Sequence, residues 1–337
     1  MPRHCLSLPL LGTSTGRTLA LAICLLAAIP APTQAQAANW PNRPIRSIVP
    51  FPPGGSADAI SRLLAAEMSR TFGQQVIVEN RPGAGATIGI DQGVKSAPDG
   101  HTIFLAPAGA MAINLSLMPK LPYDPQKDIQ PISMIALIPM VAAVPADSSL
   151  RSVNDLIAQA RAKPGALSFG SAGNGTAMHL SGEMFQQMTQ TQLTHVPYKG
   201  SGPAVTDLLT GAIPVAFVDL SSALPHIRAG KVRGLATLGA QRTVSSPEVP
   251  TMAEQGVPGY DAVGWFGLAG PAGMPADIVN RLSAEVGRIM RMPDVREKSL
   301  AMGAEPAPGT PAEFAAFIRS EIPKWAAVVK AGNVKAD

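Results

Sequence analysis

Two glycine-rich loops carry the residues of this sequence best suited to hold a small anion. The first, PFPPGGSAD, runs from Pro50 to Asp58 and leads from a predicted strand into a predicted helix. The second, GSAGNGTAMH, runs from Gly170 to His179 in the same setting. The N-terminus of a helix exposes unpaired N–H groups and a partial positive charge. Each loop therefore ends at a potential anion site.

In the first loop, Gly54 and Gly55 permit close approach of the backbone to a ligand, because glycine adopts unusual φ values. Ser56 is a candidate N-cap. Asp58 in the first turn favours the helix dipole, but its charge would oppose an anion if it pointed inward. Taken alone, this loop favours the simpler alternative, in which the glycines only make a turn and Asp58 only caps the helix.

In the second loop, Ser171, Asn174 and Thr176 offer neutral hydrogen-bonding groups, and a helix begins near Thr176. His179 would lie on its first turn, where a structural role bonded to nearby backbone and a contact with ligand are equally open. Ligands of open α/β sheets bind outside the carboxyl ends of strands. Two such loops facing each other therefore predict a cleft lined by opposed helix N-termini.

A third loop, HVPYKGSGPA, runs from His195 to Ala204 and again joins a strand to a helix. Lys199 is the only cation in these loops and would suit a carboxylate, although a loop lysine is usually only solvated. Asp219 ends a strand, where it is either a ligand acceptor or an ordinary surface aspartate. The two main loops contain no arginine, which argues against a bidentate arginine clamp on a carboxylate.

The glycine-rich segments of the sequence do not fit the usual catalytic patterns. The segment Phe169–Gly173 lacks the first glycine of G-x-S-x-G, and Gly83–Gly89 has one residue too many for G-x-G-x-x-G. Five histidines, with no cysteine after residue 37, give no metal-ligand spacing. We therefore expect no catalytic residue, no metal and no cofactor. A hydrolase that uses Ser171 and His179 is kept as an alternative.

Residues 1–37 have the features of a cleaved signal peptide, with Arg3 and Arg17 ahead of the apolar run Leu19–Ile29. The run is shorter than the roughly 20 residues that span a bilayer, which disfavours an uncleaved anchor. Cleavage near Ala37 would remove both cysteines and lower the formal charge from +4 to +2. We expect an exported, periplasmic protein without disulfides. No basic run suggests nucleic-acid binding.

Short β-branched runs, Gly/Pro loops and helical patterns alternate along the chain, which predicts an α/β fold with mostly parallel sheets. Thr310 and Glu313 predict a capping box that opens a helix near Pro311, and Pro323 would interrupt this helix. The main predicted strands are Ile45–Pro50, Val76–Val78, Ile103–Leu105, Leu167–Phe169, His195–Val196, Ile213–Val218 and Gly234–Leu238.

Two apolar stretches, Ile135–Val144 and Ala262–Ala269, are predicted to carry the chain between two lobes. They divide the chain after the signal peptide into a discontinuous lobe 1, residues 38–140 plus 264–337, and a lobe 2, residues 141–263. Such boundaries carry an error of several residues.

Nine motifs distributed over the chain together resemble a known family. In order, they are IVPFPPGGSADAISRLLA, ENRPGAGATIG, APDGHTIFL, LPYDPQKDIQPIS, AKPGALSFGSAGNGTAMHL, HVPYKGSGPAVTDLLTG, PHIRAGKVRGLA, EVPTMAEQGVPGY and KWAAVVKAG. With them the chain closely resembles the solute receptors of tripartite tricarboxylate transporters, often called Bug receptors. The resemblance implies a type II periplasmic-binding-protein fold, α/β with two lobes and a ligand cleft between them. It also implies a partner permease with a large and a small membrane subunit.

The resemblance further implies ligand contact, partly through bound waters, by the loops that match Phe51–Asp58 and Ser171–Thr176. Two departures bear on the ligand: Ser56-Ala57-Asp58 replaces a commoner Gly-Thr-x-Asp pattern, and Ala108-Gly109-Ala110 is less polar than many members show. With the candidates above, the expected ligand-binding residues are Phe51, Pro53, Gly54, Gly55, Ser56, Asp58, Ala108, Ser171, Asn174, Gly175, Thr176, His179 and Asp219.

The sequence thus predicts a periplasmic solute-binding receptor, a monomer and not an enzyme. It would capture a small organic carboxylate and deliver it to the membrane subunits of the transporter. Citrate, C4-dicarboxylates, acidic amino acids and aromatic acids all carry the group that the loops would hold. A periplasmic sensory receptor for an organic acid remains an alternative beside the hydrolase.

Overall fold

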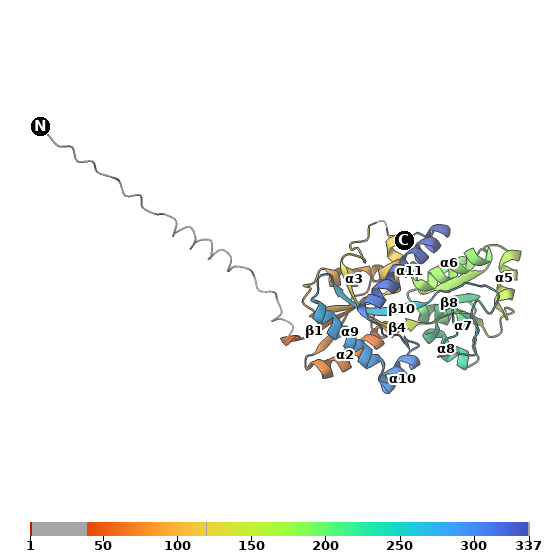
Figure 1. Ribbon diagram of the computed structural model, residues 1–337. Helices are drawn as coiled ribbons and strands as arrows, with labels where there is room; N and C mark the ends of the chain where they lie inside the picture. Colours follow the sequence, from red (N-terminus) through yellow and green to blue (C-terminus); the bar gives the residue numbers. More distant parts are fainter. Residues whose placement is uncertain (2–38, 119, 336–337) are drawn as a thin grey trace. The chain divides into compact units, whose positions relative to one another are not determined.

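The computed structural model describes residues 1, 39–118 and 120–335 (Figure 1). Apart from Met1, the predicted signal peptide lies outside the described residues. Residues 41–337 form one compact unit. Within the described part of the chain, no helix is both long and apolar enough to cross a membrane.

The first sheet has six strands in the spatial order β11 (Glu305–Pro306), β4 (Ile129–Ile138), β10 (Gly264–Pro271), β3 (Thr102–Pro107), β1 (Ile45–Val49) and β2 (Val76–Asn80). Strand β1 pairs in parallel with β2 and β3. Strand β10 runs antiparallel to β3 and β4, and β11 runs antiparallel to β4. The β-branched Ile45, Ile48 and Val49 of β1 are fully buried, which suits a strand covered on both faces.

The second sheet has five strands in the order β7 (Thr194–Pro197), β6 (Ser168–Ser171), β8 (Val215–Asp219), β5 (Met140–Pro145) and β9 (Val232–Thr237). Strand β6 pairs in parallel with β7 and β8. Strand β5 runs antiparallel to β8 and β9. The chain enters this sheet at Pro139, the single residue between β4 and β5, and returns to the first sheet between β9 and β10.

The two sheets define two α/β domains, as the sequence predicts, but each sheet is mixed rather than mostly parallel. The antiparallel pairs are concentrated at the strands next to the changes of sheet, β4, β5, β9 and β10. A strand that brings the chain across from the other sheet arrives without a helical crossover, so it is free to run against its neighbours. The predicted parallel pairing holds for the β-helix-β units.

Helices follow most of the strands and end where the sequence supplies a breaker. In α2, Ile60, Leu64 and Met68 form the buried face, and Gly73 ends the helix with φ +66°. The helices are α2 (Ser56–Phe72), α3 (Thr87–Val94), α4 (Asn114–Leu117), α5 (Val153–Ala162), α6 (Ala177–Thr189), α7 (Ser201–Leu209), α8 (Leu220–Arg228), α9 (Ala276–Met290), α10 (Pro293–Ala301) and α11 (Pro311–Ala331), with a 3₁₀ turn η2 (Ala84–Ala86) and a π-helical turn η3 (Gly109–Ile113).

Helix α11 does not stop at Pro323, contrary to the expectation from the sequence. It runs unbroken from Pro311 to Ala331, and Thr310 and Glu313 form the predicted capping box at its start. Buried side chains on both sides of Pro323, among them Ile318 and Val328, hold the helix together across the proline. This packing offsets the loss of one backbone hydrogen bond.

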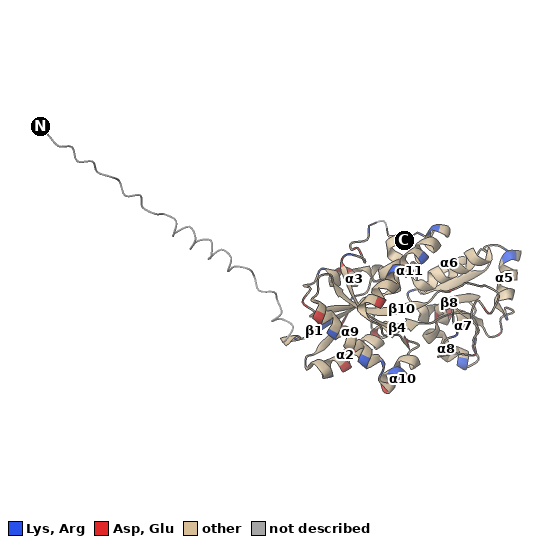
Figure 2. Ribbon diagram, in the orientation of Figure 1, with Lys and Arg blue, Asp and Glu red and all other residues tan. Residues whose placement is uncertain are grey.

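Charged side chains are dispersed over the described residues. Figure 2 shows Lys and Arg on several separate helices, among them α5, α8 and α10. Several ion pairs join near neighbours along one helix, such as Lys95 with Asp91 and Arg288 with Glu285. Pairs of this kind contribute little to stability when they are exposed.

Candidate ligand-binding site

The first candidate loop connects β1 to α2 and leaves the start of this helix without a side-chain cap. Gly55, not Ser56, is the N-cap residue, and Ser56 is the first helical residue. Gly54 has φ +91°, which explains the glycine at this position. Because Gly55 has no side chain, the amide groups of the first helical turn remain open.

Asp58 supports this loop from within. Its carboxylate accepts hydrogen bonds from the Gly54 N–H at 3.0 Å, from Arg62 Nε at 2.9 Å and from Asn80 Nδ2 at 2.9 Å. Burial opposes ionisation of the group, yet these donors hold the pKa of Asp58 below its ordinary value. The side chain is 7% exposed. The structural interpretation of Asp58 therefore accounts for all its contacts.

The first turn of α2 offers three amide groups to a ligand. Within residues 39–118 and 120–335, the N–H groups of Ser56, Ala57 and Asp58 donate no hydrogen bond, whereas Ala59 donates to Gly55 O. The Gly54 N–H, in contrast, is taken by Asp58. The open donors of this loop are thus the amides of Ser56, Ala57 and Asp58, which follow Gly54 in the chain.

The second candidate loop connects β6 to α6 and has a capped helix start. Thr176 is the N-cap, and its hydroxyl accepts from the His179 N–H at 3.2 Å and donates to Gly173 O at 2.7 Å. The Gly175 N–H donates to His179 Nδ1 at 3.2 Å. The N–H groups of Ala177 and Met178 donate no hydrogen bond within the described residues. These two amides are the open donors here.

His179 bonds to the backbone of this loop, the contact that the structural interpretation expected. Its ring also stacks on His195 with the centroids 3.8 Å apart and an interplanar angle of 9°. Burial, and then the neighbouring His179, lower the pKa of His195 to about 3. His195 is therefore neutral over the physiological range.

Ser171 is paired with His195 rather than with His179. Its Oγ lies 2.7 Å from His195 Nε2 and accepts the Gly173 N–H at 3.2 Å. The serine is fully buried. The strand pairing brings Phe169 opposite His195 across β6 and β7. In the sequence, only the alternation of strands and helices could indicate the contact between Ser171 and His195. It predicts that β6 and β7 are parallel neighbours, whose residues lie side by side in one sheet.

The remaining predicted residues are spread around these loops. Phe51 packs against Phe266, with the ring centroids 6.2 Å apart, and Pro53 is exposed. Ala108 is buried directly before η3. Asp219 caps α8, and its Oδ2 accepts hydrogen bonds from Ser221 and Ser222. Asn174 lies in the turn before Thr176 and is half-buried.

Asn114 is a residue that the sequence did not single out, and it links loops of the two domains. Its Nδ2 donates to Gly85 O at 3.2 Å and to Thr87 Oγ1 at 3.3 Å. A Cβ built on Gly175 would lie 3.8 Å from Asn114 Oδ1, and one on Gly109 would lie 3.7 Å from Gly175 O. The second loop therefore lies close to Asn114 and Gly109 of the first domain. Asn114 sits in a four-residue helix without any motif.

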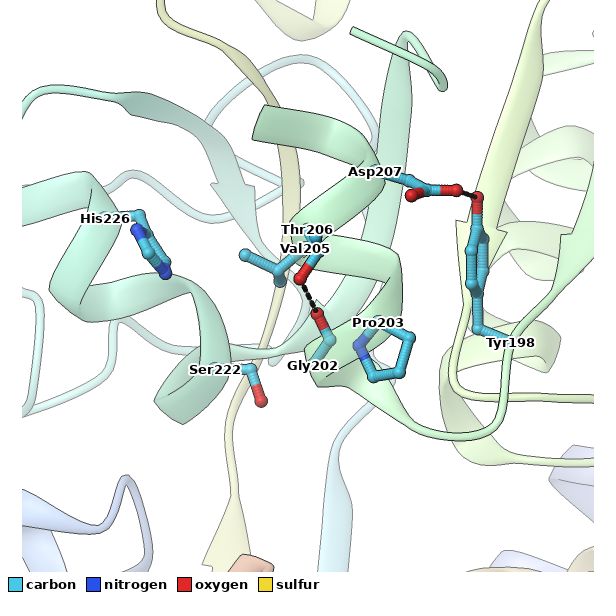
Figure 3. A pocket seen from close by; sticks show the side chains of 8 residues that line it. All are labelled: Tyr198, Gly202, Pro203, Val205, Thr206, Asp207, Ser222 and His226. Atoms are coloured by element: carbon cyan, nitrogen blue, oxygen red, sulfur yellow. Dashed lines mark hydrogen bonds between the residues drawn. The ribbon is translucent and has the colours of Figure 1, made fainter. Parts of the chain in front are cut away.

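A surface hollow of about 680 Å³ lies between α7 and α8 and is distinct from both loops (Figure 3). Figure 3 shows Tyr198 and Asp207, whose side chains are joined by a hydrogen bond of 2.7 Å. The hollow contains none of the predicted ligand residues. Its lining residues are Tyr198, Gly202, Pro203, Val205, Thr206, Asp207, Ser222 and His226.

The site has the chemistry of anion binding by backbone. In residues 50–58 and 170–179 the sequence has no lysine or arginine, and Lys199 in the third loop is exposed. Among the described residues, no group of three His, Cys, Asp or Glu side chains is placed to hold a metal ion. In the part of the two loops that the structure describes, the open donors are the first-turn amides of α2 and α6. Each of these helices follows the carboxyl end of a strand.

Comparisons with known proteins identify the family of this chain. A profile described as "Tripartite tricarboxylate transporter family receptor" matches residues 60–334. Protein BugT of Bordetella pertussis is 42% identical over 310 residues, which cover 92% of this chain and 94% of BugT.

Two solved structures from Rhodopseudomonas palustris show the same fold with ligands bound. Rpa4515 with adipate has a TM-score of 0.81 at 35% identity and covers 88% of this chain and 99% of its own. MatC with bound malate has a TM-score of 0.77 at 31% identity and covers 86% of this chain and all of its own. The predicted fold and family are confirmed, and the chain belongs to the receptor family of tripartite tricarboxylate transporters.

Proposed function

We propose that this receptor binds a small organic carboxylate between its two domains and delivers it to the membrane subunits of a tripartite transporter. The observation that carries the proposal is the pair of open first-turn amide groups, at Ser56–Asp58 in α2 and at Ala177–Met178 in α6. Each set follows the carboxyl end of a strand in its own sheet. The adipate and malate bound by the two relatives support a carboxylate as the ligand class.

The absence of a cation in the two main loops has a consequence for selectivity. A carboxylate held by amide groups and water is recognised by position and by the shape of the cleft, without an arginine clamp. The residues around the loops that would shape the cleft are Phe51, Ala108 and Asn174. Gly55 admits the ligand to the amides of α2, because it carries no side chain.

The remaining parts of the proposal concern the state of the protein. We infer that it is exported to the periplasm, cleaved near Ala37 and active as a monomer, with the large and small membrane subunits as partners. The lobes are proposed to be residues 38–140 plus 264–337 and residues 141–263. The change of sheet at Pro139 and the return before Gly264 support these bounds.

The geometry of Ser171 favours binding over hydrolysis. A serine nucleophile needs a base in contact and an exposed hydroxyl. Ser171 contacts His195, but it is fully buried, and its Oγ also accepts the Gly173 N–H. The sensory alternative uses the same cleft. Deletion of the gene would separate the two roles, because a transport receptor is needed for uptake and a sensor only for induction.

A proline at the first helical position tests the amide mechanism directly. Ser56→Pro removes one first-turn N–H, and proline is well tolerated at this position of a helix. Gly55 has φ −85° and ψ 175°, which suits a residue before proline. Ser56→Ala removes only the hydroxyl and keeps the N–H, so it is the matched control.

We expect Ser56→Pro to weaken adipate binding at least tenfold in calorimetry, because a hydrogen bond to a charged group contributes about 1.5–3 kcal/mol. Ser56→Ala should stay within about threefold of the unmodified protein, less than about 1 kcal/mol. Equal affinities for Ser56→Pro and Ser56→Ala would remove the α2 amides from the site. Failure to bind any organic acid would overturn the carboxylate proposal itself.

A further inference from the structure

Helix α11 belongs to the hydrophobic cores of both domains. Phe314 and Ile318 in its first half pack in one cluster with Trp265 of β10. Trp325 and Val328 in its second half pack in another cluster with side chains of the second sheet. Figure 1 shows α11 running past β10 toward α6. One helix therefore connects the two cores.

The proline in α11 lies at the joint between these two halves. Pro323 has no N–H, so the hydrogen bond to the carbonyl of Arg319 is missing. Ile322, directly before it, packs against both clusters. A helix that lacks one backbone bond bends most easily at that point. The joint thus coincides with the change from one core to the other.

A buried carboxylate bridges the same joint. Glu321 is 4% exposed, and its Oε2 accepts hydrogen bonds from Trp265 Nε1 at 3.2 Å and from Trp325 Nε1 at 2.9 Å. Its Oε1 lies 2.8 Å from Lys324 Nζ, which in turn lies 3.7 Å from Asp261 Oδ2. One side chain thus ties β10 to both halves of the helix.

A charge at this position is not needed for packing. An apolar side chain of similar volume would fill the space without desolvation of a carboxylate. Because Lys324 pairs with Oε1, Oε2 satisfies both indole N–H groups only while Trp265 and Trp325 both reach it. It therefore favours one relative placement of the two cores over others.

In the placement that Glu321 favours, the two domains contact each other. Glu305 of β11 in the first domain accepts the Val244 N–H of the second domain at 2.8 Å. Gly109 and Gly175 also lie close together, since a Cβ built on Gly109 would be 3.7 Å from Gly175 O. This is the arrangement of the domains that the structure shows.

We propose that Glu321 is a positioning residue that stabilises the arrangement of the two domains seen in this structure, with Pro323 of α11 as the joint about which the domains can move. Although residues 264–337 are assigned to one lobe, Trp325 packs in the second core and Trp265 in the first. Motion of the second half of α11 with the second core separates the two side chains, and Oε2 then keeps at most one of the two indole N–H groups. This inference rests on the proposed ligand cleft, but it concerns the domain equilibrium, which is measurable without ligand.

The two tryptophans provide the readout. The sequence has three tryptophans, so a Trp40→Phe background leaves only Trp265 and Trp325, both at Glu321. In this background we compare Glu321→Gln with Glu313→Gln. The control makes the same change in the same helix, at the capping box of its first turn. Glu321→Gln keeps the shape of the side chain but places a neutral amide, instead of a charged carboxylate, next to Lys324.

Without ligand, Glu321→Gln should shift tryptophan emission to longer wavelength and increase the radius of gyration in small-angle scattering. With adipate as the probe, it should weaken binding by about fivefold or more, the usual size of a conformational coupling. Glu313→Gln should match the parent in all three measurements. Unchanged emission, radius and affinity in Glu321→Gln would overturn the proposal.

If Glu321→Gln does not fold, Pro323→Ala takes its place in the test. This variant restores the backbone hydrogen bond to the carbonyl of Arg319 and should reduce the ligand-free radius of gyration. An unchanged radius would overturn the proposal. If the parent binds no organic acid, the carboxylate proposal fails by itself. The ligand-free emission and scattering then still decide the role of Glu321.

Discussion

At the scale of single residues, both ligand loops contain the same supporting contact. In the first, the Gly54 N–H donates to Asp58; in the second, the Gly175 N–H donates to His179. Donor and acceptor are four residues apart in each case, and each acceptor is the third residue of its helix. The side chains that sequence alone offers as ligand contacts thus hold the loops in shape. Next to these supporting contacts, the amides of Ser56 and Ala57 in the first loop and of Ala177 and Met178 in the second donate no hydrogen bond within the described residues.

His195 predicts a pH dependence of stability. Its folded pKa of about 3 lies below the ordinary value of 6.5. Its neutral state therefore contributes stability above pH 6.5, and the contribution is lost as the pH falls toward 3. Over this range the unfolded state binds one more proton, so the free energy of unfolding should fall by about 1.4 kcal/mol per pH unit from this residue.

Urea unfolding of His195→Gln between pH 7 and pH 5 measures this contribution. The glutamine can still bond Ser171 but cannot take up a proton, so the loss of stability with falling pH should be smaller by that slope. His226→Gln, in the same domain but outside the stack, is the control and should retain the slope of the unmodified protein. If the free energy of unfolding depends on pH equally in His195→Gln and in the unmodified protein, the prediction is wrong.

What the sequence predicts at this scale depends on how local the contact is. The capping box at Thr310 involves residues three apart, and it is confirmed. The contact between Ser171 and His195 spans 24 residues and requires the register of two strands. The hydrophobic pattern gives the strands but not their register, so Ser171 was matched with the nearer His179.

At the scale of elements, the turn after α10 packs tightly against the second domain. A Cβ on Gly303 would lie 2.4 Å from Ser221 Cβ and 2.8 Å from its Cα. Gly303 also has φ +70°. The turn thus fits against the first turn of α8 only because residue 303 has no side chain, and α8 follows Asp219 directly.

Gly303→Ala should therefore be much more damaging than a glycine replacement in open space. Gly211 has φ +74° with nothing within 4 Å of its Cβ position, so Gly211→Ala measures backbone strain alone, about 1–2 kcal/mol. Gly303→Ala should lose a further 1–3 kcal/mol through overpacking. Urea unfolding measures both, and equal losses would show that the turn has room to move away from α8.

The elements themselves follow largely from the sequence, whereas their ends and pairing directions do not. Alternating apolar patterns and glycine loops predict β1, α2, β6 and α6 within a few residues. Nothing local distinguishes a parallel from an antiparallel neighbour, so the antiparallel β5 and β10 were missed. The continuity of α11 through Pro323 was missed for a related reason. It depends on side chains of both cores, which only the assembled molecule brings together.

At the scale of the whole molecule, the two sheets are joined by more than the chain between them. Residues 41–337 form one compact unit, since α11 enters both cores and Ala112 and Ile113 of η3 pack with the second one. An open amide set starts from each domain. If both sets hold the same carboxylate, removal of one donor should change the contribution of the other.

A double-mutant cycle tests this coupling between the domains. Ala177 is the first residue of α6, and Thr176 before it has φ −78° and ψ 158°, so Ala177→Pro removes one amide as Ser56→Pro does in α2. Each variant alone should weaken adipate binding by about 1–3 kcal/mol in calorimetry. For two donors on one carboxylate, the double variant should depart from the sum by about 0.5 kcal/mol or more. Losses that add within error would place the two helix N-termini on separate parts of the ligand, and the carboxylate would then be held from one domain only.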